Sequence, residues 1–222
     1  MATAASMTMA SVAAILNPRL RKFPTWPVYL SLLVPAGVYF YWAVTNQLGA
    51  DPLQVLERQL GKWTLQLLIL TLLVTPLRKW TGISLLKFRR AFGLVAFTYV
   101  CLHLLTWLVL DKQFFWDEIL RDLYKRPYII IGMTAFVVLV PLAVTSNNFS
   151  IRRLGGAAWN KLHRLAYVAI ILGAVHYMMV VKAWPLEPIL YVIGCVALVM
   201  VRFRWGRIVK SVPRHPKSVP DT

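Results

Sequence analysis

Acidic side chains are scarce in this sequence. Its 222 residues include eight Asp and Glu against 25 Lys and Arg, which gives a formal net charge of +17. In a soluble protein such a charge would suggest a nucleic-acid partner. However, apolar residues make up 59% of the chain and occur in runs long enough to cross a bilayer, which excludes an ordinary soluble domain. We therefore expect an integral membrane protein whose basic residues contact anionic lipid and no nucleic acid.

Cysteine is rare as well, and two sequence signals are missing. Cys101 and Cys195 both fall within apolar runs, where we expect them to act as small apolar residues rather than as a disulfide. No CxxCH motif occurs, which excludes covalent haem attachment of the c type. The first basic residue is Arg19, so residues 1–24 lack the charged front of a secretory signal, and we interpret them as a mobile cytoplasmic tail.

Apolar runs of roughly 17 to 20 residues, the length that about 30 Å of hydrocarbon requires, occur six times. They cover residues 27–45, 62–77, 92–110, 128–144, 162–181 and 186–203. Because lipid offers the backbone no hydrogen-bond partner, we predict an all-α integral membrane protein with six transmembrane helices. The predicted six-helix transmembrane domain covers residues 25–205, and a basic cytoplasmic tail follows at 206–222. Pro35 should kink the first span and leave backbone groups for its neighbours to satisfy.

Basic residues are concentrated in four segments, which sets the expected orientation. The N-terminal tail, the loops after the second and fourth spans, and the C-terminal tail hold 18 of the 25 basic residues and one of the eight acids. By the positive-inside rule we expect both termini in the cytoplasm. On the opposite side, residues 111–126 alternate charges with apolar residues near helical spacing, which predicts an interfacial helix. This helix could anchor the protein in the bilayer surface, or it could be a docking platform for a partner on the outer side of the membrane; the sequence leaves both roles open.

Three of the four histidines lie within the apolar runs, where an imidazole without a partner is costly. His103 lies in the third span, and His163 and His176 lie in the fifth. Apart from Glu187 at the very start of the sixth span, the predicted spans contain no carboxylate, so none is expected inside the membrane to pair with them, and we predict axial ligation of haem iron. The third and fifth spans run in the same direction, and His103 and His176 lie similarly far along them. These two residues can therefore share one iron.

A second site near the cytoplasm is a further hypothesis. His163 precedes His176 by 13 residues, which places it about 20 Å nearer the cytoplasm in a helix. The position 13 residues before His103 is Arg90, so an inner site would combine one histidine with one arginine. His163 could equally be an interfacial base. Contacts to haem propionates, or topology and lipid contacts, are alternative roles for three arginines: Arg89, Arg90 and Arg164.

Membrane histidines also act as proton relays in transporters, which gives an interpretation from a different functional class. Transporters usually show internal repeats and helices interrupted at the midplane. Neither feature is visible in this sequence. A proton-coupled transporter is therefore the less favoured alternative to a haem protein.

Four stretches of the sequence resemble one known family. They are RRAFG (89–93), CLHLLTW (101–107), PLAVTSNNF (141–149) and RRLGGAAWNKLHRLAY (152–167), with His176 beyond them. These stretches are similar to the haem-binding membrane subunit of the bacterial methionine sulfoxide reductase system, the MsrQ or YedZ family. That family belongs to a ferric-reductase-like transmembrane group that also includes NADPH oxidases. The resemblance therefore implies a ferric-reductase-like bundle of six transmembrane helices.

The resemblance also implies a b-type cytochrome of the bacterial inner membrane. It would pass electrons to a periplasmic molybdopterin-containing methionine sulfoxide reductase that repairs oxidised proteins, as an electron-transfer subunit rather than the catalytic one. His103 and His176 match the family's haem histidines and His163 matches the third, while Arg90, with Arg89, takes the place of the fourth histidine of NADPH oxidases. The expected cofactors are one haem b, with a second haem as an alternative, and FMN by resemblance alone.

The electron donor is expected to be a separate molecule. About 20 residues follow the sixth span, fewer than the roughly 30 of the smallest nucleotide-binding βαβ unit. The resemblance implies membrane quinol or a cytoplasmic flavin reductase as the donor. Within redox chemistry, the alternative is a quinol-linked cytochrome b subunit that serves another acceptor.

Overall fold

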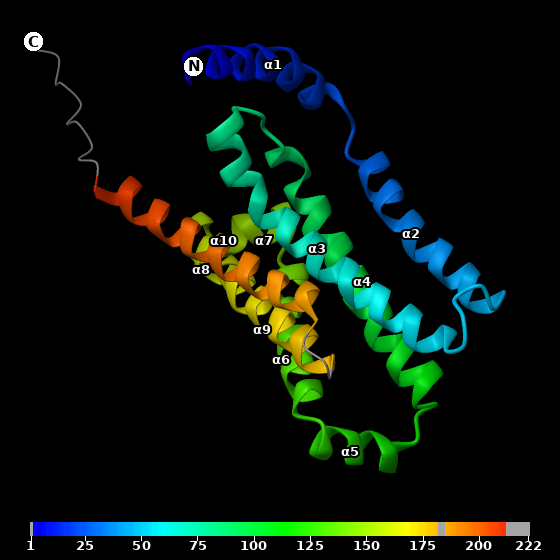
Figure 1. Cartoon of the computed structure of the whole chain (residues 1–222). Helices are drawn as coiled ribbons and strands as arrows, with labels where there is room; N and C mark the ends of the chain where they lie inside the picture. The colour runs from blue at the N-terminus through cyan, green and yellow to red at the C-terminus, as the bar shows by residue number, and fades with distance from the viewer. Residues whose placement is uncertain (1, 182–184, 212–222) are drawn as a thin grey trace, which may run out of the picture.

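The computed structural model describes residues 2–181 and 185–211, and this part of the chain is helical, with short connections and no strand (Figure 1). Six of its helical segments are long and apolar enough to cross a membrane. The prediction of an all-α, multi-pass membrane protein with six spans is therefore confirmed. The helices are α1 (Ala2–Lys22), α2 (Trp26–Val44), α3 (Pro52–Thr81), η1 (Leu86–Phe88), α4 (Arg89–Leu105), η2 (Thr106–Asp111), α5 (Trp116–Lys125), α6 (Pro127–Val144), α7 (Asn148–Leu154), α8 (Gly156–His163), α9 (Leu165–Val180) and α10 (Leu186–Ser211).

Two helices outside the spans mark the two ends of the bundle. Helix α5 crosses one end and α1 lies across the other, so we call these the α5 end and the α1 end (Figure 1). Between them, α3 packs mainly against α4, and α6 packs against α9, which α10 covers. Helix α3 is the most buried of the spans and α2 the least. The interior is therefore built around α3 and is lined by Leu, Ala and Ile side chains of α3, α4, α6 and α9.

Helix α2 lies at the edge of the bundle, and Tyr99 of α4 attaches it there. Pro35 lacks an N–H group and disrupts the hydrogen bonds of the turn around it. The Tyr99 hydroxyl donates to the Leu32 carbonyl (2.8 Å) and accepts from the Ala36 N–H (3.1 Å). It thus bridges two groups that an undisturbed helix would pair directly. The prediction that a neighbour satisfies the backbone around Pro35 is confirmed.

Helix α3 begins ten residues earlier than the sequence predicted. The Asp51 side chain caps it by accepting from the Gln54 N–H (3.0 Å), and Pro52 occupies the first turn. The added turns bring Glu57 and Arg58 into the spanning helix. The expectation that no carboxylate other than Glu187 lies within the spans is therefore wrong, because Glu57 is a half-buried residue of α3.

The N-terminal segment, where the sequence predicted a mobile tail, forms helix α1. The Asn17 side chain donates to the Gly82 carbonyl (3.1 Å) and accepts from the Ser84 N–H (2.9 Å). Lys87 donates to the Arg21 carbonyl (2.7 Å), which caps the end of the helix. These bonds tie α1 to the connection between α3 and α4.

Two further predicted segments can be located. The helix expected within residues 111–126 is α5, whose exposed side chains include Trp116, Leu120 and Tyr124 at intervals of four residues. Of the basic tail predicted at 206–222, residues 206–211 continue α10 and residues 212–222 lie outside the described part of the chain.

Candidate functional site

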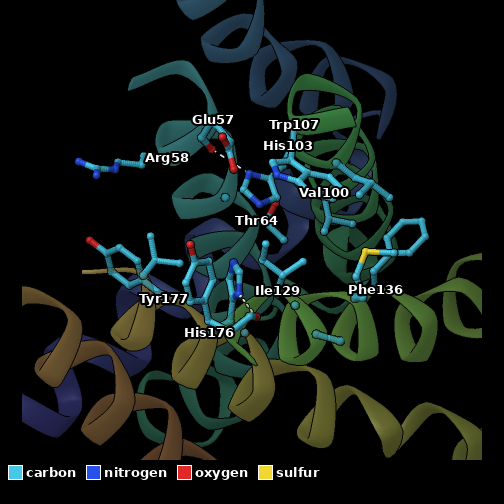
Figure 2. Close-up of a pocket in the computed structure, with 18 of the residues that line it drawn as sticks. Glu57, Arg58, Thr64, Val100, His103, Trp107, Ile129, Phe136, His176 and Tyr177 are labelled. Atoms are coloured by element: carbon cyan, nitrogen blue, oxygen red, sulfur yellow. Dashed lines mark hydrogen bonds between the residues drawn. The ribbon is translucent and has the colours of Figure 1, made fainter. Parts of the chain in front are cut away.

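A cavity of about 640 Å³ lies toward the α5 end, among α3, α4, α6 and α9. A cavity of this size is in the range of small-molecule and cofactor sites. His103 of α4 and His176 of α9 both line it (Figure 2). Its charged lining residues are Asp51, Glu57, Arg58, Lys62, Asp111, Lys112 and Arg126. Its apolar lining residues include Leu65, Leu68, Val100, Phe136, Leu139 and Ala169.

The imidazoles of His103 and His176 face each other across this cavity. Their ring centroids are 6.2 Å apart and their planes make an angle of 80°. An imidazole nitrogen about 2 Å from a metal places the ring centroid about 3 Å from that metal, so opposite ligands have centroids about 6 Å apart. The observed separation therefore fits one metal ion bound between the two rings.

Both imidazoles are held through the same ring atom. His103 Nδ1 lies 2.9 Å from the Glu57 carbonyl oxygen, and His176 Nδ1 lies 2.7 Å from the Tyr128 carbonyl oxygen. A carbonyl only accepts, so each Nδ1 must carry the hydrogen, and each Nε2 then has a free lone pair. Histidines that bind metals usually donate from the other ring nitrogen in this way, which fixes the tautomer and the ring orientation.

Two glycines give the imidazoles room to reach these carbonyls. Gly61 lies four residues after Glu57 on α3, and Gly132 lies four residues after Tyr128 on α6. A Cβ at Gly61 would come within 3.3 Å of the His103 ring. A Cβ at Gly132 would come within 2.8 Å of His176 Nδ1, closer than real contacts allow. Each histidine therefore rests against a helix at a glycine and bonds to the carbonyl one turn earlier.

Two imidazoles alone are an incomplete ligand set for a transition metal. Among the residues that the structure describes, no group of three or more His, Cys, Asp or Glu side chains could hold a metal ion. The remaining ligands would have to come from a flat macrocycle, as in haem proteins with two axial histidines. The facing rings, the matched tautomers and the cavity volume all fit an iron porphyrin between His103 and His176.

Comparison with known proteins places the chain in a family. The family described as "Ferric reductase like transmembrane component" matches residues 60–174, which include His103 and His163. The protein-methionine-sulfoxide reductase heme-binding subunit MsrQ of Brucella ovis is 50% identical to this chain over 186 residues, which cover 84% of both chains. The MsrQ proteins of Brucella canis and Brucella abortus show the same identity and coverage. The chain belongs to the MsrQ family.

In this MsrQ family member, the structure does not bring His163 to the cavity. The His163 ring stacks on Trp159, with centroids 3.8 Å apart, and its Nε2 lies 3.1 Å from Thr145 Oγ1. The Thr145 hydroxyl donates to the Pro141 carbonyl (2.6 Å), so it must accept from His163, and Nε2 carries the hydrogen. The ring nitrogen that binds haem iron in most proteins is therefore already occupied.

The three arginines singled out in the sequence also lie outside the cavity lining. Arg90 donates to Asn148 Oδ1 (2.8 Å), which joins the start of α4 to the start of α7. Arg89 is half-buried beside it, and Arg164 is exposed where α8 meets α9. The structure thus places the predicted propionate contacts away from the facing histidines.

Several residues of the site were missed in the sequence. Gly61, Gly132 and the carbonyls of Glu57 and Tyr128 position the imidazoles, and Arg58 lies on the charged side of the cavity. A glycine inside a helix is unfavourable by about 1 kcal/mol relative to alanine and so calls for a packing reason. That signal was present at Gly61 and Gly132. The backbone acceptors leave no trace in a sequence.

Proposed function

We propose that this chain binds one haem b between His103 and His176 and passes electrons through it across the bacterial inner membrane. The geometry of the two imidazoles, 6.2 Å apart with both Nδ1 atoms held by carbonyls, is the observation that supports this most. The relatives in Brucella are named as heme-binding subunits, which supports the same cofactor. When bound, the haem supplies an iron that can take up and release one electron.

The residues of the chain supply ligand geometry and a partly apolar surrounding. His103 and His176 present Nε2 atoms whose orientation is fixed by the carbonyl bonds at Nδ1. Apolar side chains such as Leu65, Leu68 and Phe136 line part of the cavity and would lower the polarity around a haem held by the two histidines. Axial ligand identity and burial are the main means by which a protein sets a haem potential.

The charge distribution supports an orientation of the proposed site in the membrane. The α1 end carries the basic loops, so we place it in the cytoplasm and the α5 end in the periplasm. The cavity then lies nearer the periplasm. Electrons would leave it for a periplasmic molybdopterin-containing methionine sulfoxide reductase, in keeping with the name of the Brucella relatives. The donor in this proposal is membrane quinol or a cytoplasmic flavin reductase with FMN.

The proposal contains one haem rather than two. His163 is engaged by Thr145 and Trp159, and Arg90 is engaged by Asn148. A second haem at the α1 end would have to break both arrangements. His163 is therefore assigned a packing role in this proposal, and the exposed Arg90 and Arg164 are assigned to the membrane surface.

Single alanine variants of the three histidines test the haem site. The protein is purified in detergent, and its visible spectrum and pyridine haemochrome stoichiometry are measured. We expect His103→Ala and His176→Ala to lose the low-spin spectrum and most of the haem, whereas His163→Ala keeps one haem per chain. An unchanged spectrum in both of the first two variants would refute the proposal.

A separate experiment tests the assignment of the acceptor. In a bacterium that lacks this gene, periplasmic methionine sulfoxide reductase activity is followed with the wild-type chain and with His176→Ala restored. We expect only the wild-type chain to restore electron supply. Equal supply with no chain present would point to another acceptor, while the haem site could still be correct.

A further inference from the structure

The cavity has a charged side and an apolar side. Figure 2 shows Arg58 and Tyr177 on one side of the two imidazoles, and Val100 and Phe136 on the other. The Arg58 side chain is exposed and extends outward from the two imidazoles, so a ligand between the rings would reach this cation only with a group that projects from its edge, while its opposite edge would meet hydrocarbon. Haem b has this polarity, since both of its propionates lie on one edge of the ring.

Arg58 differs from the other basic residues of the cavity lining. Lys62 forms an ion pair with Glu187. Lys112 lies 2.9 Å from Asp122, and Arg126 lies 3.3 Å from the same carboxylate. Among the residues that the structure describes, Arg58 makes no ion pair. Its guanidinium is the lining cation that can accept an anionic partner without giving one up.

The position of Arg58 on α3 couples it to the axial ligand. It follows Glu57, whose carbonyl accepts from His103 Nδ1, and it precedes Gly61, against which the same imidazole rests. All three residues belong to the continuous helix α3, so the helix fixes the spacing between them. A group bound to Arg58 would therefore be held at a fixed position relative to the His103 imidazole.

From these observations we infer that Arg58 binds a propionate carboxylate of the haem and sets which edge of the haem faces the α5 end. This inference rests on the proposed function. A guanidinium binds a carboxylate through two parallel hydrogen bonds, which gives both affinity and orientation. The reversed orientation would place the carboxylates beside the apolar side chains of Val100 and Phe136, where desolvation of a charge is costly.

Replacing the arginine should affect both haem binding and the midpoint potential. A hydrogen bond to a charged group is stronger than one between neutral groups, so we expect Arg58→Gln to speed haem loss by about tenfold or more. Removal of the positive charge leaves the propionate uncompensated, which favours ferric over ferrous iron. The midpoint potential of Arg58→Gln should therefore fall below that of the wild type.

The decisive experiment varies the carboxylate and the arginine together. Apo-protein of the wild type and of Arg58→Gln is reconstituted with haem b and with haem b dimethyl ester, in which both carboxylates are masked. Arg121→Gln, an exposed arginine of α5 outside the cavity lining, is the control. With haem b, Arg58→Gln should lose haem faster and show a lower potential than the wild type and the control. With the ester, all three proteins should be alike.

Other outcomes overturn the inference and identify what failed. Equal haem loss in the wild type and Arg58→Gln with haem b would exclude a contact to the propionate. A defect of the same size with the ester would show that Arg58 acts on the fold alone. Arg58→Lys guards against misfolding, because it keeps the charge and should lose only part of the affinity. If the wild type binds no haem through His103 and His176, the proposed function fails instead.

Discussion

The two ends of this bundle hold histidine in opposite ways. At the α5 end, His103 and His176 donate from Nδ1 to helix carbonyls, so both Nε2 atoms keep a lone pair that faces the cavity. At the α1 end, His163 donates from Nε2 to Thr145 and stacks on Trp159. All three imidazoles belong to spanning segments. The two ends therefore differ in which ring nitrogen bonds to the protein. Where Nδ1 makes this hydrogen bond, Nε2 stays available as a ligand, and where Nε2 makes it, that nitrogen is not available.

The largest effect should follow from filling the contact that holds His176. In Gly132→Ala, a Cβ would lie 2.8 Å from Nδ1 and 2.9 Å from Cε1, so the ring must leave the Tyr128 carbonyl. Loss of such an outer hydrogen bond typically lowers metal affinity by about 10- to 100-fold. We expect the low-spin spectrum to give way to a largely high-spin one, measured by visible absorption and electron paramagnetic resonance.

A graded series separates this effect from a general response to Gly→Ala changes. Gly61→Ala should act in the same direction but more weakly, since its Cβ would lie 3.3 Å from the His103 ring. Gly93→Ala, in the helix that carries His103, meets nothing within 4 Å and should leave the spectrum unchanged. An equal change in all three variants would contradict the claim that the glycines seat the imidazoles.

Much of the α5 end was predictable from sequence because it depends on two regular quantities. Hydropathy locates the spans, and the constant rise of a helix places His103 and His176 at one depth when their helices run in the same direction. The structure has six spans and brings these two rings together. Nothing more specific than length and spacing was needed for that part of the site.

The remainder was not predictable, for two physical reasons. Glu57 and Arg58 made the first turns of α3 too polar to be recognised as part of a span by hydropathy. A hydropathy rule takes no account of polar side chains that line a cavity inside a membrane protein, as these two do. The hydrogen bond at His163 Nε2 is made to the hydroxyl of Thr145, which lies at the end of α6 and 18 residues away in the sequence. His163 became a candidate ligand because it precedes His176 by the same 13 residues that separate Arg90 from His103. That spacing does not show which nitrogen of the His163 ring makes a hydrogen bond.

A smaller effect is expected from the ion pair that closes the α5 end. Lys112 pairs with Asp122 of α5 (2.9 Å) and with Asp111 (3.2 Å), and both Lys112 and Asp122 are largely buried. In Asp122→Asn, Asp111 still pairs with Lys112, so we expect a loss of about 2 kcal/mol, less than for a fully broken buried pair. The measurement is the unfolding free energy in detergent at pH 7.

The same pair predicts a pH dependence with a definite sign. Burial lowers the pKa of Lys112, but its hydrogen bonds to Asp122 and Asp111 outweigh this and raise the pKa above 10.5. A raised folded-state pKa means that the stabilisation is complete below the unfolded value of about 10.4 and is lost as the pH rises through the folded value. The stability difference between wild type and Asp122→Asn should therefore be constant from pH 7 to about 10 and shrink above it. A difference that already shrinks near pH 8 would contradict this assignment.

The smallest effect should come from the α1 end, where the bond that holds His163 is neutral. In Thr145→Val, the hydroxyl between His163 and the Pro141 carbonyl is lost at nearly constant volume, which should cost about 1 kcal/mol of unfolding free energy. Thr145→Ser keeps the hydroxyl and is the matched control. The haem spectrum and stoichiometry should be the same in both variants, because the Nε2 atom that Thr145 holds has no part in the cavity at the α5 end. A spectral change in Thr145→Val that Thr145→Ser lacks would mean that His163 contacts a haem, and the contrast between the two ends would then be wrong.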